Sequence, residues 1–264
     1  MQQKFSLNQH RGDQAMANSD LTNAIPAGGQ DMSTAGKLFG VIFSPGEAFE
    51  AISCKPDFVA PLVVLIAGSV ALTECMLAKI GAAQIVRNAI AQSSGGKNMT
   101  PDQIDRIAAQ GAKNVAIFTR IVEFLGVPIF LLIVAAIALL IVNAIFGSEI
   151  KFKTAFSISA YADIPSVLAS LIGIVMIFFG DPSHFDPNNF LPTKPSFFMD
   201  PQQVPKPLYA LGSSIDIFYF WFMILLAVGL STATGKKVKP LPIFLGFFVV
   251  WALITVARVG FALI

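Results

Sequence analysis

Charged residues are scarce in this chain of 264 residues, in which Lys and Arg number 18 and Asp and Glu number 16. They make up 13% of the sequence, whereas soluble domains carry roughly 25% charged residues. Hydrophobic residues make up 55%, and the mean hydropathy is +0.69. A water-soluble globule of this composition would expose large apolar patches and aggregate. The composition therefore excludes an ordinary soluble enzyme and a disordered protein, and it predicts an integral membrane protein.

Histidine and cysteine are equally scarce, with two residues of each. His10 and His184 stand far apart in the sequence, and Cys54 and Cys75 lack the spacing of a metal or redox motif. The sequence contains no P-loop, no glycine-rich nucleotide motif and no nucleophile elbow. A net charge of +2 gives no electrostatic support for nucleic-acid binding. We therefore expect no catalytic residues, no metal, no cofactor and no nucleic-acid partner.

Five apolar runs are long enough to cross a bilayer as helices, since a crossing takes about 20 residues. They predict an all-α fold, a polytopic membrane bundle of five transmembrane helices. The predicted spans are 58–80, 115–147, 154–179, 208–234 and 241–264. A separate short helix is expected before the second span, from Thr100 to about residue 110, because Thr100 and Gln103 have the form of a capping box. Residues 1–35 are polar and aperiodic, which predicts a disordered cytoplasmic tail ahead of a membrane domain at 36–264.

Lysines in two short connections predict which side of the membrane the loops face. Lys151 and Lys153 follow the second span, and Lys236, Lys237 and Lys239 follow the fourth. Short loops rich in Lys and Arg remain in the cytoplasm. We therefore expect the N-terminus in the cytoplasm and the C-terminus outside.

A juxtamembrane helix is predicted just ahead of the first span. Ser44, Pro45 and Glu47 have the form of a helix start, with Ser as N-cap, Pro in the first turn and Glu at the third position. Phe49 adds to an apolar character suited to the headgroup region. Two interpretations remain open, because this amphipathic helix could pack on the cytoplasmic end of the bundle or could present these four residues to a partner.

Charged residues within the spans are costly and are usually paired or functional. Helix rise places five of them at one level in the outer half, namely Glu74, Arg120, Glu123, Asp216 and Arg258. Asp216 and Arg258 fall at matching depths on consecutive antiparallel spans, so we expect them to pair. The cluster could be an ion-pair network that fixes the helices, or it could be a polar path or substrate site.

A second polar site is predicted in the inner half of the third span. Asp163 lies beside Pro165, which removes a helical donor and favours a break. The carboxyl group of Asp163 could be capped by the hydroxyl group of Ser159 or Tyr161. A broken span carrying an acid is also a feature of transporters, so a structural and a functional role remain open for Tyr161, Asp163 and Pro165.

The order of several short motifs resembles a known family. Lys55-Pro56-Asp57-Phe58 precedes the first span, the third span carries Ala160-Tyr161-Ala162-Asp163-Ile164-Pro165, and the fourth carries Asp216-Ile217-Phe218-Tyr219-Phe220-Trp221. With five spans and a cytoplasmic N-terminus, this pattern resembles the Yip family (Ypt/Rab-interacting membrane proteins) in its bacterial form. The resemblance implies an integral protein of the bacterial inner membrane, related to proteins that act with small GTPases in vesicle trafficking.

The resemblance and the residues together favour a non-enzymatic membrane adaptor or scaffold. Such a protein would engage an unidentified membrane protein complex in the lipid bilayer, and it could also form a homo-oligomer. The alternative function is a small transporter or channel that uses the intramembrane charges. A water-filled cavity that reaches the membrane midplane would favour the alternative.

Overall fold

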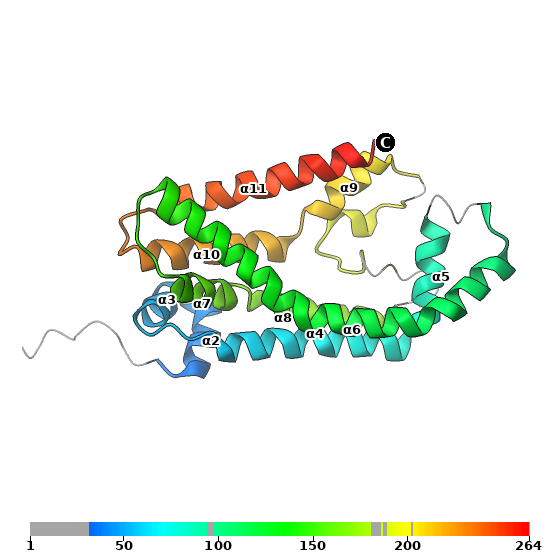
Figure 1. Cartoon of the computed structure of the whole chain (residues 1–264), viewed down its shortest axis with the longest axis horizontal. Coiled ribbons are helices and arrows are strands. Elements are labelled where there is room, and N and C mark those ends of the chain that lie inside the picture. The colour runs from blue at the N-terminus through cyan, green and yellow to red at the C-terminus, as the bar shows by residue number, and fades with distance from the viewer. Residues whose placement is uncertain (1–31, 94–97, 181–185, 187–188, 202, 264) are drawn as a thin grey trace, which may run out of the picture. The chain divides into compact units, whose positions relative to one another are not determined.

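The computed structural model describes residues 32–93, 98–180, 186, 189–201 and 203–263, and within these ranges the chain is helical with no strand (Figure 1). The predicted all-α class is therefore confirmed. In chain order the helices are α2 (Thr34–Phe43), α3 (Pro45–Cys54), α4 (Val59–Lys79), α5 (Ala82–Gln92), α6 (Pro101–Leu139), the π-helix η2 (Leu140–Ile145), α7 (Phe152–Ala162), α8 (Pro165–Phe179), the 3₁₀-helix η4 (Pro195–Phe198), α9 (Lys206–Ser214), α10 (Ile217–Ala233) and α11 (Pro240–Phe261). The predicted tail lies outside the described residues as far as residue 31, and α2 already begins at Thr34.

Four helical stretches of the described chain are long and apolar enough to cross a membrane: α4, α6 with η2, α7 with α8, and α11. The pair α9 and α10 passes the same test together but is bent by 43°. The bundle therefore has four spans, or five if the bent pair counts as one. The predicted membrane bundle is confirmed, and the region expected as the fourth span, 208–234, is divided in the structure, because the helix breaks at Ile215 and Asp216.

The second span is longer than expected. Together α6 and η2 form one stretch of 45 residues, which rises about 67 Å and exceeds twice the thickness of a bilayer core. The capping box of Thr100 and Gln103 is present, but it opens α6 itself. The expected separate helix is therefore wrong, because α6 continues without a break from Pro101. The polar first turns of α6 pack against α5, where Arg87 and Asp105 form an ion pair at 2.8 Å.

Two glycines let α4 and α8 pack closely in a parallel arrangement. A Cβ atom at Gly68 of α4 would lie 3.6 Å from the side chain of Val167, and one at Gly173 of α8 would lie 3.0 Å from Leu72. The contacts advance along both helices in the same direction. The junction of α7 and α8 at Asp163, one turn before Val167, therefore lies beside the first turns of α4.

Helices α2, α3 and α7 gather at one end of the described bundle, called the α3 end below, where α3 is inserted into the core (left in Figure 1). Phe49 of α3 is 0% exposed and packs against α10 at Gly229. A Cβ atom added to Gly229 would lie 2.8 Å from Phe49 and 2.5 Å from Ile158 of α7, so only glycine allows this approach. The juxtamembrane helix is thus part of the packed bundle.

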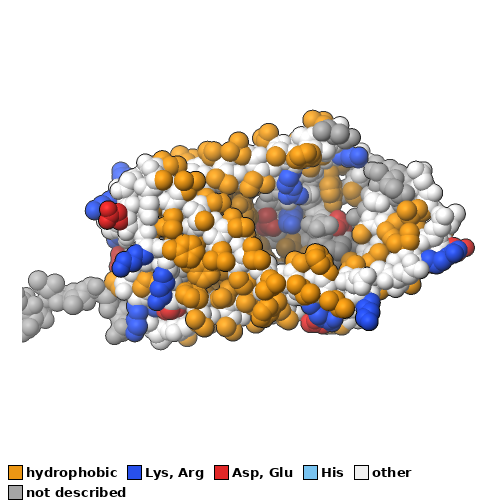
Figure 2. All heavy atoms as spheres, viewed as in Figure 1, with side chains coloured by type: hydrophobic (Ala, Val, Ile, Leu, Met, Phe, Trp, Pro, Cys, Tyr) orange, Lys and Arg blue, Asp and Glu red, His pale blue; other side chains and the backbone are white. Residues whose placement is uncertain are grey.

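Helices α5 and α9 lie at the opposite end, called the α9 end below (right in Figure 1). Apolar side chains dominate the middle of the visible face, while Lys and Arg side chains lie mainly toward the two ends (Figure 2). This distribution suits a molecule whose middle contacts lipid tails and whose ends reach the headgroups. A hollow between these ends contains basic and acidic side chains (Figure 2).

Candidate functional site

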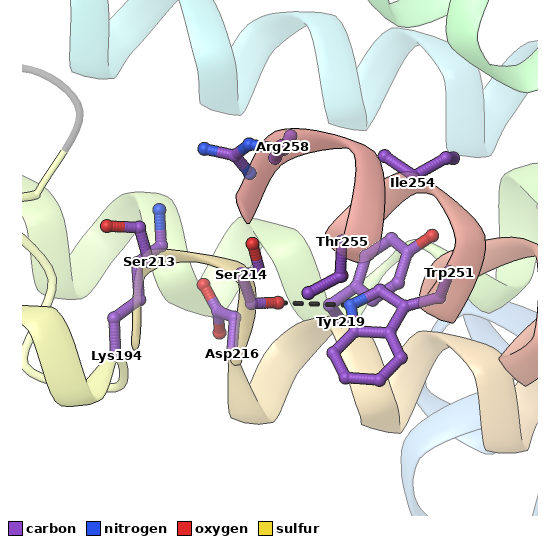
Figure 3. Close-up of a pocket in the computed structure, with 9 residues that line it drawn as sticks. All are labelled: Lys194, Ser213, Ser214, Asp216, Tyr219, Trp251, Ile254, Thr255 and Arg258. Carbon is purple, nitrogen blue, oxygen red and sulfur yellow. Dashed lines mark hydrogen bonds between the residues drawn. The ribbon is translucent and has the colours of Figure 1, made fainter. Parts of the chain in front are cut away.

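A cavity of about 290 Å³ lies where α9 and α10 break apart beside α11 (Figure 3). The described residues that line it come from the loop before α9, the junction of α9 with α10, and the last turns of α11, as Figure 3 shows. The lining residues are Lys194, Ser213, Ser214, Asp216, Tyr219, Trp251, Ile254, Thr255 and Arg258. Two of the five residues predicted as an outer cluster, Asp216 and Arg258, are therefore on one cavity.

Side chains form hydrogen bonds with the backbone groups that are left open at the break between α9 and α10. The carboxylate of Asp216 accepts a hydrogen bond from the backbone N–H of Phe218 at 2.9 Å and caps α10. The carbonyl group of Ser214, left open by the end of α9, accepts a hydrogen bond from Nε1 of Trp251 at 3.0 Å. Unpaired backbone groups are expensive within a membrane, so Asp216 and Trp251 make the break tolerable.

The predicted pair of Asp216 and Arg258 does not form, since no ion pair joins them. Asp216 instead caps α10 and accepts a hydrogen bond from the hydroxyl group of Thr193 at 3.2 Å. Within the described chain, the side chain of Arg258 is exposed and has no hydrogen-bond or ion-pair partner. Matching depth put the two residues at one level, but the capping role of Asp216 turns its carboxylate toward its own helix.

The other three residues of the predicted cluster lie elsewhere, on α4 and α6. Arg120 of α6 donates two hydrogen bonds to Glu74 of α4, one of them at 2.8 Å between Nη2 and Oε2. Both side chains are about half exposed. Glu123 has no ion pair among the described residues. The structure therefore divides the five charges between two places instead of gathering them into one cluster.

The polar residues of the third span also separate. Pro165 begins α8 and Asp163 ends α7, so the break falls where the sequence indicated. The predicted capping of Asp163 by Ser159 or Tyr161 is wrong, because the hydroxyl group of Ser159 donates to the carbonyl group of Ala155 and that of Tyr161 donates to Asp57.

Tyr161 belongs instead to a network at the α3 end that was not predicted. Its hydroxyl group donates to Oδ1 of Asp57 at 2.6 Å, and Nζ of Lys37 lies 2.6 Å from Oδ2 of the same carboxylate. Lys37 also donates to the carbonyl group of Lys55 at 3.2 Å. This network, the Lys37–Asp57–Tyr161 latch, ties α2 to the start of α4 and to α7.

The latch keeps a charge pair near the bundle surface. Burial raises the pKa of Asp57, but the hydrogen bonds from Lys37 and Tyr161 lower it more, so the pKa lies below its ordinary value. The side chain of Lys37 is only 6% exposed. A single lysine in an amphipathic helix usually faces solvent, so nothing in the sequence indicated that Lys37 is buried. The residue that could have indicated this network is Asp57, which belongs to the Lys55-Pro56-Asp57-Phe58 motif.

The residues that were predicted to dock a partner differ in their exposure in the structure. Helix α3 begins at Pro45, as expected, but the hydroxyl group of Ser44 makes no capping hydrogen bond. Ser44 and Glu47 are exposed, whereas Phe49 is fully buried in the core. The prediction that Phe49 presents a docking surface is therefore wrong, and the exposed polar face of α3 remains.

No group of three or more metal-ligating side chains occurs in the part of the chain that the structure describes. In the comparison with protein families, the family model of the Yip1 domain matches residues 39–259. Neither a curated protein nor a solved structure matches the chain. The matched range includes the latch residues Asp57 and Tyr161, the break at Asp163 and the lined cavity up to Arg258. The chain therefore belongs to the Yip1 family of integral membrane proteins.

Proposed function

We propose that this protein is a non-enzymatic membrane adaptor that presents a fixed surface at its α3 end to a partner complex in membrane trafficking or transport. Membership of the Yip1 family supports a trafficking-related role. The observation that carries the proposal is the way α2 and α3 are fixed to the rest of the bundle. Phe49 is seated against Gly229, and Lys37 is bound to Asp57.

The fixed position of α2 and α3 has a physical consequence for the binding of a partner. A surface that is already ordered pays less conformational entropy when it binds a partner. The exposed residues of the two helices include Phe39 and Phe43, at 67% and 79% exposure, beside the polar Ser44 and Glu47. The aromatic pair suits the headgroup region, and the polar pair suits a protein partner at the membrane surface.

The proposed location is the bacterial inner membrane, with the N-terminus and the α3 end in the cytoplasm. Support comes from the two lysine-bearing loops, which meet at the α3 end. Glu149 and Lys237, one from each loop, line the same cavity. Lys151 and Lys153 lie close by on a neighbouring cavity. A cluster of lysines at one end of a bundle favours a cytoplasmic position for that end.

A small transporter is the second candidate, favoured by the position of Asp216 on a cavity. Trp251 lines the cavity, and its indole ring packs against Phe220 and Phe248 with ring centroids 5.2 Å apart in each pair. Beyond these rings lies the buried core that surrounds Leu226 and Phe49. This packing of aromatic rings on a buried core favours the adaptor over a conduction path.

Site-specific photo-cross-linking in native membranes tests the adaptor. A cross-linking amino acid at Ser44 and, separately, at Glu47 should capture the same membrane protein. The substitution Gly229→Leu, which displaces Phe49, should reduce both yields, while the matched Gly126→Leu in α6 should not. Equal cross-linking yields in the wild type and in both glycine variants would count against a surface that is held in place by Phe49. Solute uptake by liposomes that contain only the purified protein would overturn the adaptor in favour of the transporter.

A further inference from the structure

Arg258 provides an unused cation on the cavity between α9, α10 and α11. Among the described residues, its guanidinium group has neither an acidic partner nor a hydrogen-bond acceptor, although Asp216 lines the same cavity. Asp216 is committed to the N–H of Phe218 and to Thr193. A guanidinium group carries five donors that remain charged at every physiological pH. The cavity therefore holds donors without matching acceptors.

A second cation lines the same cavity from another segment. Lys194 comes from the loop before α9, while Arg258 comes from the last turns of α11 (Figure 3). Among the lining residues that the structure describes, two are basic and one is acidic. The first turn of α10 adds the positive end of a helix dipole beside Asp216. Arg258, which has no partner among the described residues, therefore favours an anion in this cavity.

Helix rise gives the depth of this cavity. From Pro240 to Arg258, α11 rises about 27 Å, and the 17 residues of α10 rise about 25 Å. A bilayer hydrocarbon core is about 30 Å thick. Arg258 and the first turn of α10 therefore lie close to the boundary between the hydrocarbon core and the headgroups, at the α9 end.

The surface next to the cavity is apolar. Ile254, one turn before Arg258, lines the cavity and is 54% exposed, and Leu253 and Phe261 of the same helix are 66% and 76% exposed. These side chains would lie against lipid tails in a membrane. A molecule in the cavity can thus have an anionic part beside Arg258 and an apolar part along α11.

We propose that this cavity binds the phosphate of an anionic phospholipid headgroup. Arg258 donates two parallel hydrogen bonds to the phosphate oxygens, which is the geometry that guanidinium groups favour. Lys194 supplies a second charge, and the acyl chains follow Ile254 and Leu253. The cavity volume of about 290 Å³ lies at the lower limit of small-molecule sites, so a small headgroup such as phosphoglycerol fits best. This site is separate from the adaptor surface at the α3 end.

A lipid titration of the purified full-length protein in neutral detergent tests the proposal. Thermal unfolding is measured against added phosphatidylglycerol, phosphatidylcholine or soluble glycerol 1-phosphate. We expect phosphatidylglycerol to raise the unfolding temperature at the lowest concentration. Arg258→Gln should raise the half-saturating concentration about tenfold, the effect of losing one charged hydrogen-bonded contact. Arg106→Gln removes another exposed arginine outside the cavity and should leave it unchanged.

Each other result overturns the proposal. Equal half-saturating concentrations for the wild type and Arg258→Gln would show that the lipid binds elsewhere, and an equal loss in Arg106→Gln would show only general attraction to positive charge. Equal potency of glycerol 1-phosphate would identify a soluble anion as the occupant. If Arg258→Gln does not fold, Arg258→Lys and Lys194→Gln replace it, and unchanged lipid affinity in both would refute the site. Cross-linking from Glu47 should be unaffected throughout, which separates this site from the proposed adaptor function.

Discussion

Gly229 is the position where one added methyl group tests how α3 is held in the bundle. A Cβ atom there would lie 2.5 Å from Cγ2 of Ile158 and 2.8 Å from Cδ1 of Phe49, whereas ordinary contacts begin at 3.4 Å. Ile158 and Phe49 are both 0% exposed, so neither side chain can turn into open space. The substitution Gly229→Ala must therefore move α3, α7 or α10.

The size of the effect follows from two opposing contributions. Overpacking a core costs about 1–3 kcal/mol. Replacing glycine by alanine inside a helix gains about 1 kcal/mol of helix propensity. Gly126→Ala in α6 receives the same gain, but its Cβ atom would meet only Val122, at 3.9 Å. The difference in unfolding free energy between the two variants, about 1–3 kcal/mol, therefore isolates the close contact at Gly229.

Thermal unfolding of the purified variants in detergent measures this difference. A change of 1 kcal/mol shifts the Tm of a protein of this size by about 2–4 °C, so Gly229→Ala should unfold several degrees below Gly126→Ala. Phe49→Leu should cost less in the Gly229→Ala background than in the wild type, because the smaller side chain relieves the overlap. If Gly229→Ala unfolds at or above the temperature of Gly126→Ala, the tight seating of α3 is refuted.

Three further predictions concern the polar contacts. The pKa of Asp57 is lowered in the folded state, so the stabilising effect of its carboxylate is complete above the ordinary value of 3.8 and is lost as the pH falls below that value. The unfolding temperature should therefore depend less on pH between pH 6 and pH 3 in Asp57→Asn than in the wild type, and an equal dependence would refute the latch. Glu74→Ala or Arg120→Ala alone should lower the yield of folded protein more than the double variant does, because a single substitution strands one charge at membrane depth; a double variant with the lowest yield would contradict this. Trp251→Phe keeps an aromatic ring but leaves the carbonyl group of Ser214 unpaired, which should cost about 1–3 kcal/mol in thermal unfolding; an unchanged Tm would show that this hydrogen bond does not support the break.

The helices that cross the membrane were largely predictable, because a span is a local property of about 20 residues. Hydropathy alone could not find the ends of these helices. The extension of α6 from Pro101 is polar, and it is helical because it packs against α5. The break before α10 had a local signal that hydropathy averages away, since Asp216 is a strong N-cap residue within an apolar run.

The candidate sites were less predictable, because depth along a helix does not determine direction around it. Glu74 and Arg120 share a level and meet. Asp216 and Arg258 share a level and do not pair, since the carboxylate of Asp216 is used by the backbone of α10. Lys37 and Asp57 are the opposite case, because they form a pair that was not predicted. They lie 20 positions apart in the sequence, and only tertiary packing brings them together.

The polar groups of the two ends are organised differently, and this difference supports separate roles. At the α3 end, Lys37, Asp57 and Tyr161 satisfy one another, so that end is fixed before any partner arrives. At the α9 end, Asp216 is satisfied by its own helix while Arg258 retains its donors. A self-satisfied network stabilises a surface, whereas an unmatched cation beside exposed apolar side chains gains most from an anionic lipid. The two ends therefore support the two proposals separately, because the α3 end has a fixed polar network and the α9 end has a cation with no partner among the described residues.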